Sequence, residues 1–362
     1  MCQNEVVADL KQREPSVNEI IRIGMDTSKS FFQLHGVDAG EQPVLRRKQG
    51  RRQMVEFFRQ LPPTMIGIEA CGGAFHWARL LQGFGHEVKL MPPQFVKPYV
   101  KRGKNDAADA QALCEAMSRP TMRFVPVKTA EQQAALMLVG TRDTLVRRRG
   151  QLSSMIRGYA AEFGLTAAKG LDKIEPLLAR LRAEATIPAM ARELFALQAK
   201  EFGALQARLK TVEAKLMAWH RQNERSRRLA KIPGVGPIGA AMLAMKTPDP
   251  QAFASGRDFA AWIGLTPRDH STAGKVRLGV ITKAGDEDVR RVLVAGASAV
   301  IQQLQRGRGR PSPWLAALLK RKPRMLAAVA LANKTARIAW KLMVSGETYD
   351  ATRGRPALAP AA

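Results

Sequence analysis

The spacing of short apolar runs between residues 20 and 118 constrains the fold of this 362-residue chain more than any other feature. Three such runs follow one another through short connections, which favours an antiparallel meander. Helix-like and strand-like segments then alternate. The expected order of strand, strand, strand, helix, strand, helix, strand and helix falls at residues 20–26, 31–37, 43–48, 52–61, 65–69, 74–84, 87–91 and 105–118. The sequence therefore predicts a mixed α/β domain at residues 20–125.

This order of elements is that of the ribonuclease H-like fold, in which the first strand, the fourth strand and a late helix carry metal-binding acids. Here those elements carry Asp26, Glu69 and the pair Asp106 and Asp109. A spacing of three places the paired aspartates on one helix face. Carboxylate oxygens are the ligands that Mg²⁺ requires, so the pattern predicts a site for Mg²⁺ (or Mn²⁺). Each acid taken alone also fits a solvated residue, and Asn105 with Asp106 fits a helix cap.

The charge balance indicates a polyanionic partner. Lys and Arg number 58 against 31 Asp and Glu, which gives a formal net charge of +27. Nucleic acid is the commonest polyanion, and an anionic membrane is the alternative. No apolar run reaches the roughly 18 residues that a membrane span needs, and the N-terminus has no signal-peptide pattern. Cys2, Cys71 and Cys114 match neither a disulfide framework nor a zinc motif. We therefore expect a reduced, cytoplasmic protein that binds nucleic acid.

Residues 130–225 are almost wholly helical in pattern. Apolar residues there alternate steps of three and four, which predicts a long, coiled-coil-like helical middle region. This seam consists of Phe195, Gln198, Phe202, Leu205, Leu209, Val212, Leu216 and Trp219. An antiparallel helix pair, an oligomer interface and an ordinary bundle core all fit this pattern.

Residues 226–345 predict a helical C-terminal domain. Residues 231–241 resemble the hairpin of a helix-hairpin-helix module, in which a Gly-x-Gly turn frees backbone N–H groups to meet a phosphate. Two or three further helices are expected at residues 289–345. The flanking segments, residues 1–18 and 350–362, are expected to be flexible.

A hydroxyl pair lies in a Gly- and Lys-rich loop of this C-terminal region. Ser271 is a candidate nucleophile because basic residues around it could neutralise a phosphate that it attacks. These candidate nucleic-acid-binding residues are Lys275, Arg277, Lys283 and Arg290. His270 is adjacent, but loop neighbours often point apart, so it is not expected to act as a base. A turn hydroxyl that bonds its own backbone is the competing interpretation of Ser271.

Three stretches together resemble a known family. They are Ile-Gly-Met-Asp-Thr-Ser-Lys at residues 23–29, Lys-Asn-Asp-Ala-Ala-Asp-Ala at residues 104–110, and the segment 264–286 with its Ser-Thr-Ala-Gly-Lys loop. They are similar to insertion-sequence transposases with an Asp-Glu-Asp-Asp, RuvC-like N-terminal domain, the bridge-RNA-guided serine recombinases. The resemblance covers about residues 20–345. The loop is similar to the subgroup with Ser-Ser/Thr-Gly-Gly-Lys, with Ala273 in place of the first glycine.

The resemblance implies a mechanism and partners. The four acids would hold the metal near the scissile phosphate, and Ser271, with Thr272 as its nearest competitor, would form a covalent phosphoserine. The acids of one subunit would meet the serine of another in a homodimer or homotetramer. A structured RNA encoded beside the gene would pair with donor and target DNA. Residues 226–345 would then be the C-terminal transposase domain that carries the catalytic serine.

Two other functions fit the residues. The first is a resolvase-type, metal-dependent DNA junction endonuclease that uses activated water, with Ser271 structural. The second is a scaffold that binds RNA or DNA without catalysis. Denaturing gels separate the first from the recombinase, since only a serine nucleophile leaves a protein–DNA adduct.

Overall fold

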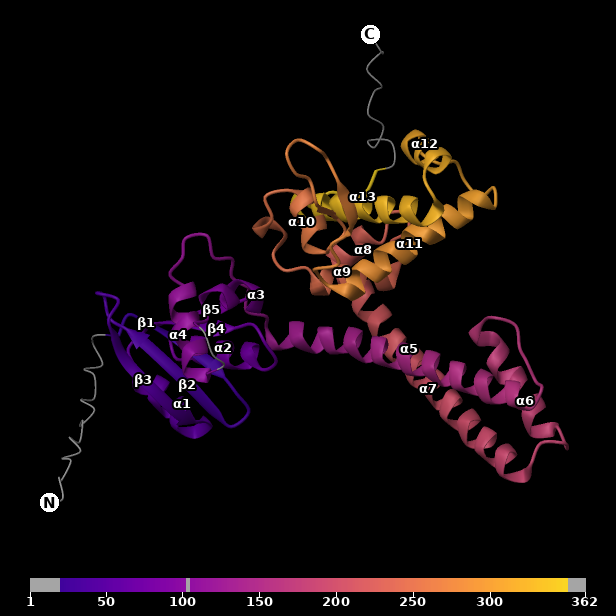
Figure 1. Cartoon of the computed structure of the whole chain (residues 1–362), viewed down its shortest axis with the longest axis horizontal. Coiled ribbons are helices and arrows are strands. Elements are labelled where there is room, and N and C mark those ends of the chain that lie inside the picture. The colour runs from indigo at the N-terminus through magenta and orange to yellow at the C-terminus, as the bar shows by residue number, and fades with distance from the viewer. Residues whose placement is uncertain (1–19, 102–104, 351–362) are drawn as a thin grey trace, which may run out of the picture. The chain divides into compact units, whose positions relative to one another are not determined.

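The structure is a computed structural model that describes residues 20–101 and 105–350 (Figure 1). The chain divides into two compact units, Met1–Ala130 and Glu131–Ala362. Residues 1–18 and 351–362, which the sequence predicts to be flexible, lie outside the described residues, as does Lys104 of the aspartate motif.

A five-stranded mixed sheet forms the first unit, with strand order β3-β2-β1-β4-β5. The first three strands are antiparallel neighbours, whereas β1, β4 and β5 run parallel. The bounds are β1 Arg22–Thr27, β2 Phe31–Val37, β3 Pro43–Gly50, β4 Met65–Glu69 and β5 Glu87–Met91. The predicted mixed α/β domain is confirmed, and its sheet order is consistent with a ribonuclease H-like fold.

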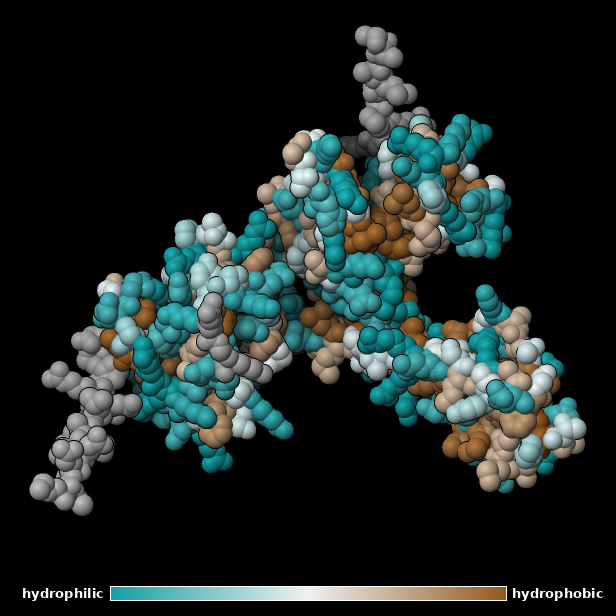
Figure 2. All heavy atoms as spheres, in the orientation of Figure 1, coloured by the Kyte–Doolittle hydropathy of each residue, from teal (hydrophilic) through white to brown (hydrophobic). Residues whose placement is uncertain are grey.

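Helices cover both faces of this sheet. On one face, α1 and α2 pack over the apolar side chains of the strands, among them Ile23, Met25 and Ile68. On the other face, α4 packs against β1, β2 and β4. The bounds are α1 Arg51–Gln60, α2 Ala74–Gly83, α3 Pro93–Val96 and α4 Asp106–Ala116. Figure 2 shows that hydrophilic residues cover most of the visible face of this unit.

Long helices open the second unit. The helices α5 (Ala130–Glu162), α6 (Ile174–Ala183) and α7 (Ala189–Gln222) share one hydrophobic cluster, and α5 and α7 lie side by side in Figure 1. Phe202 and Leu209 of the predicted seam are buried in this cluster. The seam therefore packs within the chain, which fits both the antiparallel helix pair and the ordinary bundle core.

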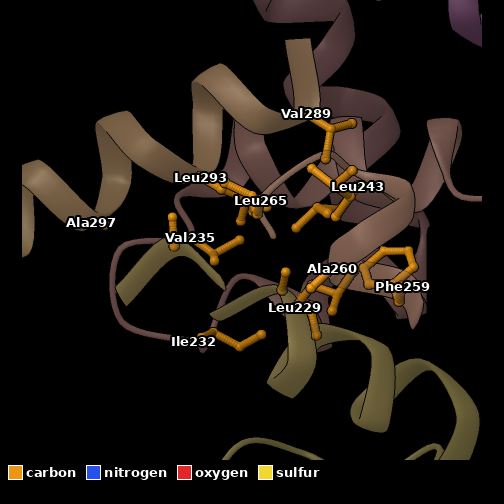
Figure 3. Packing of buried hydrophobic residues seen from close by; sticks show 14 of the residues in the cluster. Leu229, Ile232, Val235, Leu243, Phe259, Ala260, Leu265, Val289, Leu293 and Ala297 are labelled. Atoms are coloured by element: carbon orange, nitrogen blue, oxygen red, sulfur yellow. The ribbon is translucent and has the colours of Figure 1, made fainter. Parts of the chain in front are cut away.

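The C-terminal helices enclose a second core, part of which Figure 3 shows. The turn between α8 and α9 enters this core: Gly234 has a φ of 83°, and a Cβ on it would lie 2.9 Å from the Gly296 carbonyl oxygen of α11. The bounds are α8 Glu224–Leu229, α9 Pro237–Lys246, α10 Gly256–Trp262, α11 Glu287–Gln305, α12 Pro313–Arg321 and α13 Arg324–Ser345.

The expectation of an all-helical C-terminal region is wrong at one place. Strands β6 (Pro267–Asp269) and β7 (Leu278–Ile281) form a two-stranded antiparallel sheet. Val276, Leu278 and Val280 alternate along the second arm of this hairpin with large exposed fractions, so its pattern of period two has no buried face. No helix in the described ranges is long and apolar enough to span a membrane.

Candidate metal and nucleophile sites

The register of the central strands brings two of the predicted acids together. β1 and β4 are parallel neighbours with Met25 opposite Ile68, so Asp26 and Glu69 form the next pair in that register. Paired residues of neighbouring strands point to the same face of a sheet. Both acids lie at the carboxyl ends of their strands, on the face that α4 covers.

Two glycines allow α4 to lie directly on this face. A Cβ on Gly24 of β1 would overlap the backbone of α4 at Ala110 and Cys114, and one on Gly67 of β4 would lie 2.6 Å from the Met117 Cε atom. Gly24 and Gly67 are opposite each other in the register. Neither position was predicted from the sequence, although a glycine inside a strand marks a close approach of another backbone.

The first turn of α4 carries the other two acids. Asn105 caps the helix, because its side-chain oxygen accepts a hydrogen bond from the Ala107 N–H at 3.0 Å. Asp106 is exposed and Asp109 is half-buried. The capping interpretation therefore applies to Asn105 and leaves both aspartate side chains available for another role.

The four carboxylates influence one another electrostatically. Burial, followed by the charges of Asp109, Asp106 and Glu69, raises the pKa of Asp26 to about 6. Burial and the charge of Asp109 also raise the pKa of Glu69. A carboxylate responds in this way when like charges lie close and water is partly excluded. The structure thus brings Asp26, Glu69, Asp106 and Asp109 within electrostatic range of one another.

The donor set fits a hard divalent cation in its chemistry. It consists of oxygen atoms alone, and a cation would offset the repulsion that raises the pKa of Asp26. Within residues 20–101 and 105–350, no three His, Cys, Asp or Glu side chains already lie close enough to hold a metal ion. The acids would therefore have to come closer together than they are here to share one ion.

Ser271 lies in the hairpin that joins β6 and β7. Its hydroxyl oxygen accepts a hydrogen bond from the Arg277 backbone N–H at 3.0 Å, and its own N–H donates to the Asp269 carboxylate at 2.8 Å. Hydrogen bonding from the Ser271 side chain and backbone lowers the pKa of Asp269. These contacts fix the hydroxyl within the hairpin, while the exposure of Ser271 leaves it accessible to a DNA strand.

The predicted basic residues fall into two groups. Lys275, Arg277 and Lys283 are exposed on or beside the hairpin. Arg290 is half-buried, and its Nη1 atom donates to the carbonyl oxygens of Ile263 at 2.9 Å and Gly285 at 3.2 Å. The three exposed side chains are free to approach a phosphate, whereas Arg290 also holds the segment that follows the hairpin.

The turn of the hairpin contains one residue in an unfavourable backbone conformation. Thr272 and Lys275 exchange two backbone hydrogen bonds across Ala273, with a φ of 46°, and Gly274, with a φ of 80°. Two positive φ angles favour Asn or Gly at both central positions of such a turn. Ala273 is therefore strained relative to glycine.

We expect Ala273→Gly to stabilise this turn by about 0.5–1 kcal/mol, because glycine adopts positive φ without steric cost. Amide hydrogen exchange of peptides that contain Lys275 measures the effect, since the Lys275 N–H donates across the turn at 2.9 Å. Exchange should slow in this variant and accelerate in the matched variant Gly274→Ala. Faster exchange in Ala273→Gly would contradict the assigned turn.

A mixed sheet with clustered carboxylates at its strand ends is typical of enzymes that act on phosphodiester bonds with divalent metals. Comparison with known proteins agrees with this class. A family model described as "Transposase", of the DEDD type of IS110, matches residues 23–163. A second model, described as "Transposase IS116/IS110/IS902 family", matches residues 226–310.

Relatives that match almost the whole chain are also named as transposases. The Sinorhizobium fredii protein y4pF/y4sB, named as a transposase, is 66% identical over 98% of this chain and 92% of its own length. The transposases for insertion sequence elements IS1328 of Yersinia enterocolitica and IS1111A of Coxiella burnetii are 38% and 39% identical. They match 91% and 95% of this chain and 98% and 95% of their own lengths.

The chain therefore belongs to the IS110/IS116 family of transposases, enzymes that cut and rejoin DNA. Transposases of this DEDD type are generally dependent on divalent metal ions. The matched segments include all four acids in the first and Ser271 in the second.

Proposed function

We propose that the chain is a serine recombinase that cuts and rejoins donor and target DNA through a phosphoserine at Ser271. One observation carries this proposal: Asp26 lies under the electrostatic influence of three other carboxylates beside the strand ends. Such a cluster is costly without a cation and is therefore difficult to explain as a structural feature alone. The exposed Ser271 hydroxyl beside exposed basic side chains supplies the second half of the chemistry.

The side chains have separate tasks in this mechanism. Asp26, Glu69, Asp106 and Asp109 would hold Mg²⁺ or Mn²⁺, which when bound polarises the scissile phosphate. Ser271 Oγ attacks phosphorus and loses its proton to solvent; the bond from phosphorus to the leaving DNA oxygen breaks, and that oxygen takes up a proton. A DNA hydroxyl then attacks the phosphoserine and restores the serine, so the phosphodiester is conserved without ATP.

Basic side chains assist at the phosphate. Lys275, Arg277, Lys283 and Arg290 would offset the negative charge that grows on the phosphate oxygens during attack. The helix-hairpin-helix-like turn at residues 231–241 would add backbone N–H contacts to the DNA backbone.

The partners and assembly follow from the resemblance and from the charge. The proposed enzyme is guided by an RNA encoded beside its gene, and it joins the acids of one subunit to the serine of another in a homodimer or homotetramer. It acts in the cytoplasm and has three parts: a RuvC-like domain at residues 20–125, a helical region at 130–225 and a transposase domain at 226–345. The net charge of +27 supports extensive phosphate contacts with both nucleic acids.

A denaturing gel of a DNA reaction tests the serine step. We expect a protein–DNA adduct from the unaltered chain with Mg²⁺, the RNA encoded beside its gene and DNA that contains the element junction. Ser271→Ala should lose the adduct and all joined product, while Thr272→Ala retains both. An adduct that persists in Ser271→Ala and disappears in Thr272→Ala would transfer the assignment to the threonine.

A resolvase-type junction endonuclease is the second candidate function. The contacts of Ser271 with Arg277 and Asp269 are local, as those of a purely structural turn hydroxyl are. In that enzyme the carboxylates would activate water, and the same gel would contain free DNA ends without an adduct. Ser271→Ala would then leave cleavage unchanged.

A further inference from the structure

A polar cavity of about 470 Å³ opens in the sheet-bearing unit. Two of the segments that line it directly follow the strands that carry acids. Lys29 lies three residues after Asp26, and Gly72 lies three residues after Glu69. The helices α1 and α2 supply the remaining walls. The cavity therefore opens at the edge of the sheet where β1 and β4 end, on the face of α1 and α2, whereas the carboxylates lie at the same edge on the face of α4.

Arg51 is held in place at the wall of this cavity. Its Nε atom donates to the Lys29 carbonyl oxygen at 2.8 Å. Its guanidinium lies over the rings of Trp77 and Phe32, at 5.3 Å and 5.8 Å from their centroids. Stacking of this kind fixes the plane of a guanidinium and preserves its outward N–H donors. Arg51 is thus oriented before any ligand arrives.

The cations of the cavity lack acidic partners. Among the residues that the structure describes, neither Arg51 nor Lys29 forms an ion pair, and no acceptor binds the Arg51 terminal NH₂ groups. Both side chains are exposed. Two unpaired cations form a local positive site at this edge of the sheet, which suits an anion.

Backbone in the cavity wall is also open to a ligand. A Cβ on Gly72 or Gly73 would meet nothing within 4 Å. No side chain caps the ten-residue helix α2 at Gly73, although the Ala74 N–H donates to the Cys71 carbonyl oxygen, and Gly73 places the positive end of the helix in this wall. Glycine at such positions lets a phosphate approach the backbone closely.

We propose that this cavity binds a phosphodiester group of the DNA strand where that strand passes the same edge of the sheet as the carboxylates, with Arg51 and Lys29 as its charged ligands. The inference rests on the proposed function, because it takes the carboxylates as the place of cleavage. The cations offset the repulsion between the acids and the approaching strand. The cavity thereby fixes the position of the strand before cleavage.

Affinity for a mixed-sequence, single-stranded DNA oligonucleotide tests the charged ligands in the full chain. Arg51→Gln and Lys29→Gln should each weaken binding by roughly three- to tenfold and reduce the slope of log K against log salt by about 0.7. The matched control is Arg52→Gln, because Arg52 is exposed on the same helix turn and does not line the cavity. This control should change affinity by less than twofold.

A second pair of variants tests the cavity without altering Arg51 packing. Gly72→Glu and Gly72→Gln introduce side chains of equal size at an exposed position, so their difference reports charge alone. We expect Gly72→Glu to bind the oligonucleotide at least threefold more weakly than Gly72→Gln. Equal affinities for this pair, or an unaltered salt slope in Arg51→Gln, would overturn the proposal.

The same measurements separate this proposal from the proposed function. Asp26→Asn should keep its affinity for the oligonucleotide and lose cleavage. If Arg51→Gln binds normally while Asp26→Asn still loses cleavage, the cavity assignment fails and the catalytic assignment stands. If Arg51→Gln weakens binding while Asp26→Asn still cleaves, the cavity is a DNA-binding site, but the catalytic assignment fails and with it the relation of this site to the place of cleavage. A loss confined to an RNA oligonucleotide of the same sequence would overturn the assignment to DNA.

Discussion

Asp26→Asn is expected to reduce DNA cleavage by at least about a thousandfold and, in the same protein, to raise the stability of the metal-free fold. The first effect follows because a carboxamide is a poor ligand for a hard cation and cannot supply the negative charge that holds it. The second follows because burial disfavours the ionised form of Asp26 and the charges of Asp109, Asp106 and Glu69 repel it. A structural acid would show the opposite sign of the stability change.

The direction of the stability change follows from how the protonation of Asp26 depends on pH. The pKa of Asp26 rises from 3.8 to about 6 on folding, so the unfolded chain releases its proton at lower pH than the folded chain does. Stability therefore falls as pH rises from about 4 to about 6 and stays lowered above that range. A shift of about two pKa units corresponds to about 3 kcal/mol, and solvent screening of a half-buried group leaves about 1 kcal/mol of this. Asp26→Asn removes this loss.

Thermal unfolding in EDTA measures the effect. The unfolding temperature of Asp26→Asn should exceed that of the unaltered chain by about 2–4 °C at pH 7, and the two should coincide near pH 4. Added Mg²⁺ should stabilise the unaltered chain more than the variant. Glu56→Gln, a change of an exposed acid that pairs with Arg59, is the control and should show neither effect. A lower unfolding temperature for Asp26→Asn at pH 7 would exclude the carboxylate cluster.

The strands could be predicted because each is a local run of apolar or β-branched residues between turn residues. The runs at residues 31–37, 65–69 and 87–91 have the same bounds in the structure as in the sequence analysis. Each is a short apolar or β-branched run, and turn residues bound it. The start of α4 could also be predicted from the sequence, because Asn105 offers the side-chain oxygen that a helix N-terminus requires.

The cations that line the cavity could not be predicted from the sequence. Arg51 and Lys29 are two of 58 basic residues, and nothing local distinguishes a cation that lines a cavity from one on an open surface. Stacking of Arg51 over Trp77 joins residues 26 positions apart and depends on the packing of α1 against α2. Such a contact belongs to the tertiary structure rather than to any motif.

The serine hairpin was missed for a different reason. Val276, Leu278 and Val280 alternate as strand residues do, but their exposed fractions are 81%, 60% and 73%. The usual inference from alternation assumes that the apolar side is buried, and Gly and Lys around Ser271 indicate a loop. Local backbone pairing across the turn at Ala273 decides the structure here.

The close contact between α4 and β1 predicts a large loss of stability when Gly24 is replaced. Gly24→Ala is expected to destabilise the sheet-bearing unit by about 3 kcal/mol or more, because the new methyl group would overlap backbone atoms of Ala110 and Cys114. Backbone atoms inside a helix cannot move aside as a flexible side chain can. The helix must therefore shift away from the strand or the unit must unfold.

Either outcome also separates the acids. Asp106 and Asp109 move with α4, whereas Asp26 and Glu69 remain with the strands. Cleavage should consequently fall even where the variant stays folded. The pKa of Asp26 should return towards its ordinary value, because burial is the largest cause that raises it and the charges of Asp109 and Asp106 come next. Urea unfolding at pH 7 measures the loss of stability, and the pH dependence of that stability reports the pKa.

Gly83→Ala is the matched control for this substitution. Gly83 ends α2, and a Cβ there would meet nothing within 4 Å. The control should leave stability unchanged or raise it by about 0.5–1 kcal/mol, because alanine favours the helix over glycine. Gly24→Ala with the stability of the unaltered chain would mean that α4 does not rest on β1. The carboxylates of α4 would then have no fixed position beside Asp26, and the proposed metal site would lose its structural basis.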